Sequence, residues 1–112
     1  MAYDALLADR VRSALNGAAG ISERKMFGGL AFMAGGYMFV GVSGKALMAR
    51  VGPERYLEAL ARSHVRVMDF TGKPMKGYVF VDPPGLETDA DLSYWIETCI
   101  GFVRSLPVRS RK

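Results

Sequence analysis

The sequence predicts an α+β domain in which three helices pack on an antiparallel sheet of five to six strands, in the order α-β(4)-α-β(2)-α. Residues 26–51 contain short apolar runs separated by glycine turns, and residues near both ends of the chain have helical periodicity. The pairs Gly28-Gly29 and Gly35-Gly36 accept the positive φ angles that hairpin turns need. We expect one domain over residues 1–107 and a short basic tail over residues 108–112.

The N-terminal half is expected to form one helix followed by a strand meander. Residues 3–16 place Leu6, Leu7 and Val11 on one face at three-to-four spacing, which is typical of an amphipathic helix. The apolar runs that follow are too short for helices and read as strands. The four strands that we expect span residues 23–27, 30–34, 37–42 and 45–51.

The third of these strands is apolar at both alternating sets of positions. Simple alternation puts Tyr37 and Phe39 on one face and Met38, Val40 and Val42 on the other. A sheet with one solvent-facing side alternates apolar with polar residues. We therefore expect both faces of this sheet to be covered, and a second copy of the chain is the simplest cover. The alternative is that the sheet curls and the Pro83-Pro84 segment covers the remaining face within one chain.

A second helix is predicted to begin at Pro53, because proline suits the first helical position, and to fray near His64. Residues 65–70 and 76–81 read as a strand hairpin joined by a turn over residues 71–74. Prolines in residues 82–85 cannot continue a sheet. The buried stripe expected on this second helix contains Tyr56, Leu57, Leu60 and Ala61.

The last helix has the strongest markers in the chain. Thr88 is a suitable N-cap with Asp91 three residues later, and Pro107 ends the helix. Trp95 is expected to be a core anchor, and Cys99 a packed and inert thiol. The apolar face of this helix contains Leu92, Trp95, Ile96, Cys99, Val103 and Leu106.

The net charge of +4 lies at the C-terminal end. Arg104, Arg109, Arg111 and Lys112 leave 11 basic and 11 acidic groups in residues 1–103, so the body of the domain is neutral. Such a tail is more typical of a solubilising terminus than of a nucleic-acid arm. The alternative is direct nucleic-acid binding through these four residues together with Arg24, Lys25 and Lys76.

Candidate catalytic and metal-binding residues are scarce in this sequence. His64 is the one histidine and Cys99 the one cysteine, and they differ in context. No nucleophile–base pair or ligand cluster is evident, and the glycine pairs lack the Lys-Ser/Thr step of a phosphate-binding loop. We expect no catalytic residue, no metal and no cofactor.

The expected location is the cytoplasm. A lone cysteine fits a reducing compartment, and the first ten residues do not resemble a signal peptide. No apolar stretch approaches the ~18 residues of a membrane-spanning helix.

Several motifs resemble the N-terminal domain of the TfoX/Sxy family, whose members are known as regulators of bacterial competence. The resemblance starts at Met26-Phe27-Gly28-Gly29 and continues through residues 36–39 and 44–50. It resumes at residues 72–78, around Gly-Lys-Pro-Met-Lys-Gly-Tyr, and at residues 92–106. It covers residues 3–107, and the opening motif together with the Lys-Pro-Met turn makes it fairly specific.

The resemblance implies a small α+β domain that acts through macromolecular contacts and has no established catalysis. Larger members also carry a C-terminal helical domain, which this chain is expected to lack. We therefore expect a non-catalytic bacterial regulatory module that forms a homodimer and contacts a regulatory protein partner. The candidate interaction surface comprises Phe27, Gly28, Gly29, Tyr37 and Phe39.

Overall fold

The computed structural model describes residues 3–16, 18, 20–26, 29–69 and 74–107. Its strands form one six-stranded antiparallel sheet in the order β1-β2-β3-β4-β6-β5. The predicted α+β class and element order are confirmed. Along the chain the elements are α1 (Ala5–Ala14), β1 (Ile21–Met26), β2 (Gly29–Ala34), β3 (Tyr37–Ser43), β4 (Ala46–Arg50), α2 (Tyr56–Leu60), β5 (Val65–Asp69), β6 (Pro74–Val81), the 3-10 helix η1 (Pro83–Leu86) and α3 (Asp89–Arg104).

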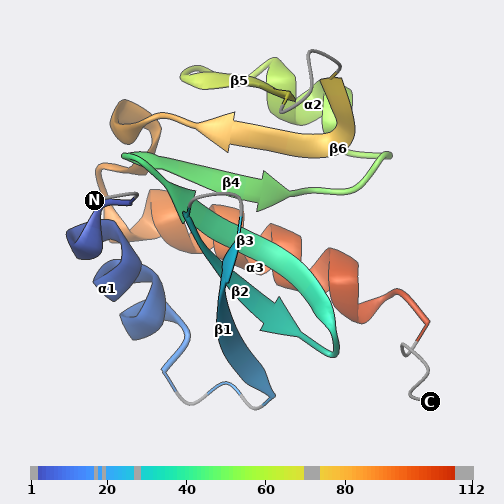
Figure 1. The fold of residues 1–112 in the computed structure, drawn as a ribbon. Helices are drawn as coiled ribbons and strands as arrows, with labels where there is room; N and C mark the ends of the chain where they lie inside the picture. The colour runs from blue at the N-terminus through green and yellow to red at the C-terminus, as the bar shows by residue number, and fades with distance from the viewer. Residues whose placement is uncertain (1–2, 17, 19, 27–28, 70–73, 108–112) are drawn as a thin grey trace.

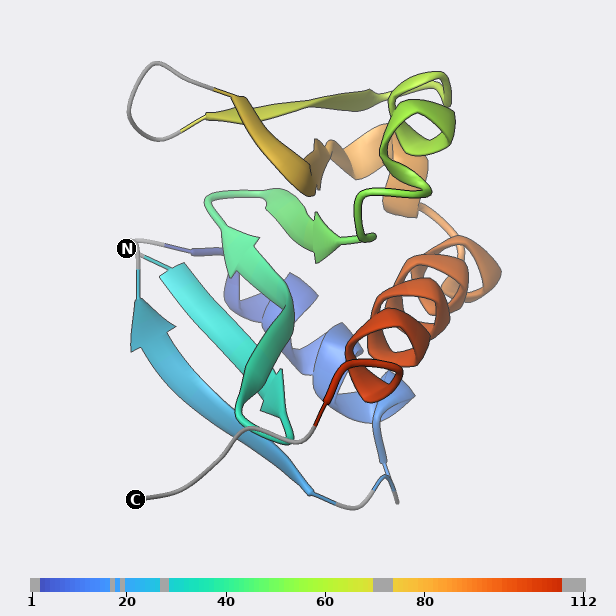
Figure 2. The same ribbon diagram turned by 90° about the vertical axis from the view of Figure 1, so that its right-hand side faces the viewer.

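The helices gather on one side of the sheet (Figures 1 and 2). Helix α3 packs on β2, β3 and β4, α1 packs on β3 and α3, and α2 packs on β5 and β6. The sheet is strongly twisted, and the β1–β2 and β5–β6 pairs both extend toward the helix-free side in Figure 2. We call this helix-free side the outer face.

The end of β4 shows why the second helix begins later than predicted. Gly52 has a φ of +90°, and its amide donates to the carbonyl of Gly77 on β6. A side chain at Gly52 would overlap the ring of Phe102. The chain therefore turns through residues 53–55 and enters α2 at Tyr56 rather than at Pro53.

Two leucines expected in the helical stripes lie at the surface instead. Leu6 on α1 is 76% exposed and Leu57 on α2 is 77% exposed. The buried positions include Ala8 and Ala59, at 0% and 4%. The small side chains of Ala8 and Ala59 allow α1 and α2 to pack closely on their neighbours. This tertiary packing, and not the spacing of leucines along each helix, decides which positions are buried.

The predicted alternation along β3 is wrong because the strand contains a bulge. Phe32 pairs with Val40 and Met33 pairs with Met38, so Phe39 is an extra residue on β3. Phe39 and Val40 consequently both belong to the helix-side core, whereas Met38 does not. Tyr37 packs at the edge of this same core, so it does not oppose Val40 as expected.

One row of paired residues crosses the outer face on all six strands. It runs Arg24–Ala31–Gly41–Met48–Phe80–Arg66, from the β1 edge to the β5 edge. The terminal methyl group of Met48 lies where a side chain at Gly41 would have to sit. Glycine at this position therefore allows Met48 to lie flat on the neighbouring strand.

The outer face is already largely buried within one chain. Ala31 and Met48 are fully buried, and Met38 is 8% exposed, although they lie outside the helix-side core. In the described part of the chain, the large apolar side chains that are exposed are Leu6, Leu57 and Val67. The described residues therefore do not form the large exposed apolar sheet face on which the predicted dimer depends.

The structure confirms the predicted start and buried face of the last helix, but α3 ends at Arg104, so Leu106 lies beyond the helix rather than on its apolar face. The Thr88 hydroxyl accepts a hydrogen bond from the Asp91 amide at 3.0 Å, which caps the helix. Trp95 is 3% exposed and Cys99 is fully buried between aliphatic residues.

The described residues include no helix long and apolar enough to cross a membrane.

Candidate functional site

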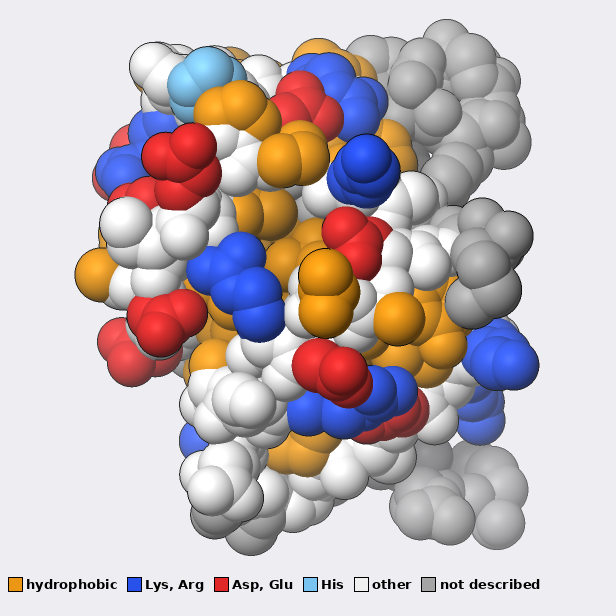
Figure 3. All heavy atoms as spheres, turned by 90° about the vertical axis from the view of Figure 1, so that its left-hand side faces the viewer, with side chains coloured by type: hydrophobic (Ala, Val, Ile, Leu, Met, Phe, Trp, Pro, Cys, Tyr) orange, Lys and Arg blue, Asp and Glu red, His pale blue; other side chains and the backbone are white. Residues whose placement is uncertain are grey.

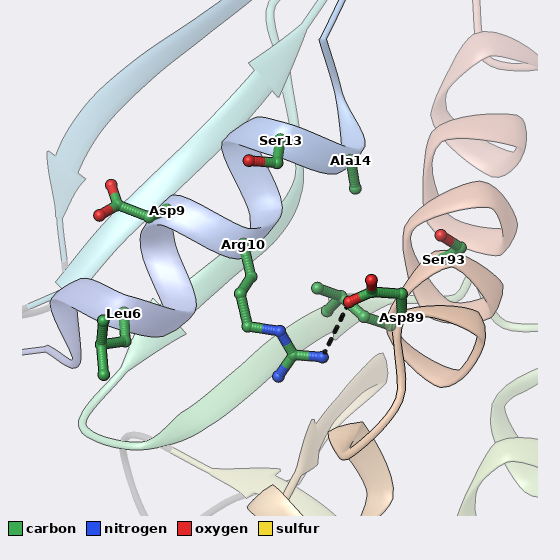
Figure 4. A pocket seen from close by; sticks show the side chains of 8 residues that line it. Leu6, Asp9, Arg10, Ser13, Ala14, Asp89 and Ser93 are labelled. Atoms are coloured by element: carbon green, nitrogen blue, oxygen red, sulfur yellow. Dashed lines mark ion pairs between the residues drawn. The ribbon is translucent and has the colours of Figure 1, made fainter.

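An open groove of about 600 Å³ lies between α1 and the start of α3 (Figure 4). Arg10 extends from α1 across this groove, where its Nη2 atom lies 3.6 Å from the Asp89 carboxylate and donates to the Thr88 carbonyl at 3.3 Å. We call it the α1–α3 groove. Its lining residues are Leu6, Asp9, Arg10, Ser13, Ala14, Asp89, Leu92 and Ser93.

Ion pairs on α1 fix the helix that forms one wall of the groove. Arg12 contacts Glu23 on β1 at 2.7 Å and Asp9 at 2.7 Å. The hydrogen bond from Arg12 lowers the pKa of the Glu23 carboxyl, and the same pairing raises the pKa of Arg12. The Arg12–Glu23 pair thus links α1 to the edge strand β1 at the protein surface.

The surface around this groove is mixed in charge. Figure 3, viewed from the side on which α1 lies in Figure 1, shows acidic and basic side chains side by side with apolar atoms between them. Leu6 supplies exposed apolar area to the groove, while Asp9, Asp89 and Arg10 supply both signs of charge. Such a surface suits protein contact better than binding of a strongly charged ligand.

A second cluster surrounds Arg50 at the end of β4. The guanidinium carbon lies 5.4 Å from the ring centres of Tyr37 and Tyr78 and 5.6 Å from that of Phe102. Pairing of β3 with β4 ends at Val40–Ala49, so Arg50 fills the place where these strands diverge. Its guanidinium forms no hydrogen bond or ion pair with any described residue. We call this the Arg50 cluster.

The expected interaction residues are not assembled into one exposed surface. Phe39 is fully buried in the helix-side core and Gly29 is buried at the start of β2, so neither is available for contact. Tyr37 is half-buried, and its hydroxyl donates to the Pro107 carbonyl at 2.6 Å. Phe27 and Gly28 lie outside the described residues.

The basic residues proposed for nucleic-acid contact are also separated. Arg24 lies on the outer face, whereas Lys25 pairs with Leu30 on the helix side. Lys76 is exposed on β6, and Arg104 is exposed at the end of α3. The tail residues Arg109, Arg111 and Lys112 lie outside the described part of the chain.

The single histidine and the single cysteine are far from forming a reactive pair. His64 is exposed in the turn after α2 with a φ of +67°. Cys99 is buried in α3, where desolvation strongly raises the pKa of its thiol. The described residues contain no group of three or more His, Cys, Asp or Glu side chains positioned for a metal ion.

Sequence reasoning missed both the α1–α3 groove and the Arg50 cluster. The spacing of Leu6 fits a buried helical stripe, and only its neighbours in space reveal that it is exposed. The aromatic residues around Arg50 come from three separate elements, so no local motif links them. Arginine with nearby aromatic residues in the sequence is too common to indicate such a cluster.

The described residues thus form a small α+β domain that carries two surface features, the α1–α3 groove and the Arg50 cluster. The profile of the TfoX N-terminal domain family matches residues 13–103, which is most of the 112 residues. The chain belongs to the TfoX N-terminal domain family. No curated protein sequence matches it.

Proposed function

We propose that the domain is a non-catalytic regulatory module that acts through protein–protein contacts, as its family relationship to competence and transcription regulators suggests. The α1–α3 groove is the contact surface, and a second copy of the chain is its first partner. The exposure of Leu6 is the observation that carries this proposal. A leucine that is 76% exposed beside an open groove provides an apolar anchor.

The charges around Leu6 support pairing of identical copies. In a two-fold dimer the same patch meets itself, so each charge must find its opposite on the partner. Asp9 and Arg10 are adjacent on α1 and have opposite signs. A two-fold contact along α1 can therefore place Arg10 of each copy near an acidic group of the other while the two Leu6 side chains fill the grooves.

Sedimentation equilibrium of matched surface variants tests this proposal. We expect the native chain, whose monomer mass is 12.2 kDa, to associate at tens of micromolar protein, and Leu6→Lys to abolish the association. Leu57→Lys is the matched control, because Leu57 is equally exposed at 77% but lies on α2. A native chain that stays monomeric, or an equal effect of both variants, would refute the proposed contact.

A further inference from the structure

A second hollow, of about 360 Å³, adjoins the α1–α3 groove at Leu6. Leu6 and Arg10 line both, so the two hollows form one continuous surface around the first half of α1. Leu6 and Pro83 are exposed and supply apolar surface to the second hollow. We call it the α1–η1 hollow; it is lined by Leu6 and Leu7 of α1, Pro83 and Leu86 of η1, and the charged residues Lys45 and Glu87.

Backbone contacts bring the three walls of this hollow together. Tyr3 forms a bridge with Gly44, and the Asp4 amide donates to the Gly44 carbonyl at 2.7 Å. These contacts hold the turn between β3 and β4, which carries Lys45, beside the start of α1. The 3-10 helix η1 packs on α3. The start of α1, the β3–β4 turn and η1 accordingly lie together at the left of Figure 1.

Lys45 and Glu87 are exposed and opposite in charge. Neither side chain forms an ion pair or a hydrogen bond with another residue that the structure describes. The other charged residues that line the hollow are engaged within the chain. The Asp4 carboxylate accepts from the Leu6 amide at 2.9 Å, and Arg10 contacts the start of α3. Lys45 and Glu87 are therefore the charges that the hollow presents to a partner.

We propose that the α1–η1 hollow belongs to the contact between two copies of the chain, and that Lys45 of each copy pairs with Glu87 of the other. This inference rests on the self-association proposed above and names the residues that set its specificity. A partner that covers the hollow has to place an acidic group opposite Lys45 and a basic group opposite Glu87. A second copy supplies both, because residues exchange roles across a two-fold contact. The hollow is also continuous with the α1–α3 groove through Leu6.

Sedimentation equilibrium of charge-reversed variants tests this pairing. Lys45→Glu and Glu87→Lys should each weaken self-association at least about tenfold, because each replaces two attractions per dimer with two repulsions. The double variant keeps the native net charge of +4 and should associate within about threefold of the native chain. An equimolar mixture of the two single variants should also form dimers, because both cross-copy pairs in the mixed dimer then join opposite charges.

Lys76→Glu and Glu54→Lys are the matched controls. They change the net charge by the same amounts at exposed positions that do not line the hollow, so they should leave association unchanged. Circular dichroism checks folding. If a charge reversal does not fold, the neutral changes Lys45→Gln and Glu87→Gln replace it, and each should weaken association.

The inference is overturned if the single reversals behave like the controls, or if the double variant and the mixture do not regain association. When Leu6→Lys still abolishes association in that case, the self-association stands and only the pairing of Lys45 with Glu87 fails. A native chain that is monomeric overturns both.

Discussion

Arg12 on α1 contacts both carboxylate oxygens of Glu23 on β1, with an Nε–Oε2 distance of 2.7 Å and an Nη2–Oε1 distance of 2.9 Å. This bidentate pair joins the first helix to the edge strand of the sheet, at a sequence separation of 11 residues. Helix α1, which this pair links to the sheet, forms the wall of the α1–α3 groove that contains Leu6. The pair is largely exposed, so its contribution to stability is modest.

Removal of this ion pair should have a small, pH-dependent effect. We expect Glu23→Gln to lower the free energy of unfolding by at most about 1 kcal/mol at pH 7. Arg12 depresses the pKa of folded Glu23 below its ordinary value of 4.5, so this stability is present above pH 4.5 and is lost as the pH falls through the folded-state pKa. Urea melts at pH 7 and pH 3 measure the difference, with Glu54→Gln as a control. An undiminished effect at pH 3 would contradict the assignment.

Truncation of Trp95 should be far more costly. Trp95 is 3% exposed and packs in the helix-side core, so Trp95→Ala should lower the free energy of unfolding by about 3–5 kcal/mol. Leu57→Ala, at an exposed position, should change it by no more than about 0.5 kcal/mol. A loss below about 1 kcal/mol for Trp95→Ala would mean that the ring is exposed in solution.

The Cys99 thiol should be unreactive in the folded protein. Desolvation raises its pKa, so little thiolate is present at neutral pH, and the side chain is fully buried. A chromogenic disulfide reagent should label Cys99 slowly in native buffer and stoichiometrically in denaturant. Complete labelling within minutes under native conditions would contradict the burial of Cys99.

Substitution at Gly41 tests the packing of the outer face. The Cβ atom of Gly41→Ala would overlap the terminal methyl of Met48 and lie 3.0 Å from the Leu30 carbonyl oxygen. We expect a loss of about 1–3 kcal/mol in the free energy of unfolding. In a Met48→Ala background the loss should be smaller, because the methyl is absent. Equal losses in both backgrounds would show that Met48 does not lie over Gly41.

The sequence was sufficient to predict the fold but not the surfaces. Glycine turns, apolar runs and the Thr88 cap are local signals, and each produced the expected element. The bulge at Phe39 depends on how β2 and β3 pair, so simple alternation assigned the wrong side of the sheet. Leu6 and Leu57 fit their helical stripes, and only tertiary packing left them exposed.

The central claim, that the α1–α3 groove is a self-association surface, is tested most directly by NMR. Backbone amide spectra of the ¹⁵N-labelled chain are recorded over a range of protein concentrations. We predict concentration-dependent shifts in residues 6–14 and 89–93, with no change at Met48 or Phe80 on the outer face. Shifts confined to the outer face, or spectra that do not change with concentration, would contradict the claim.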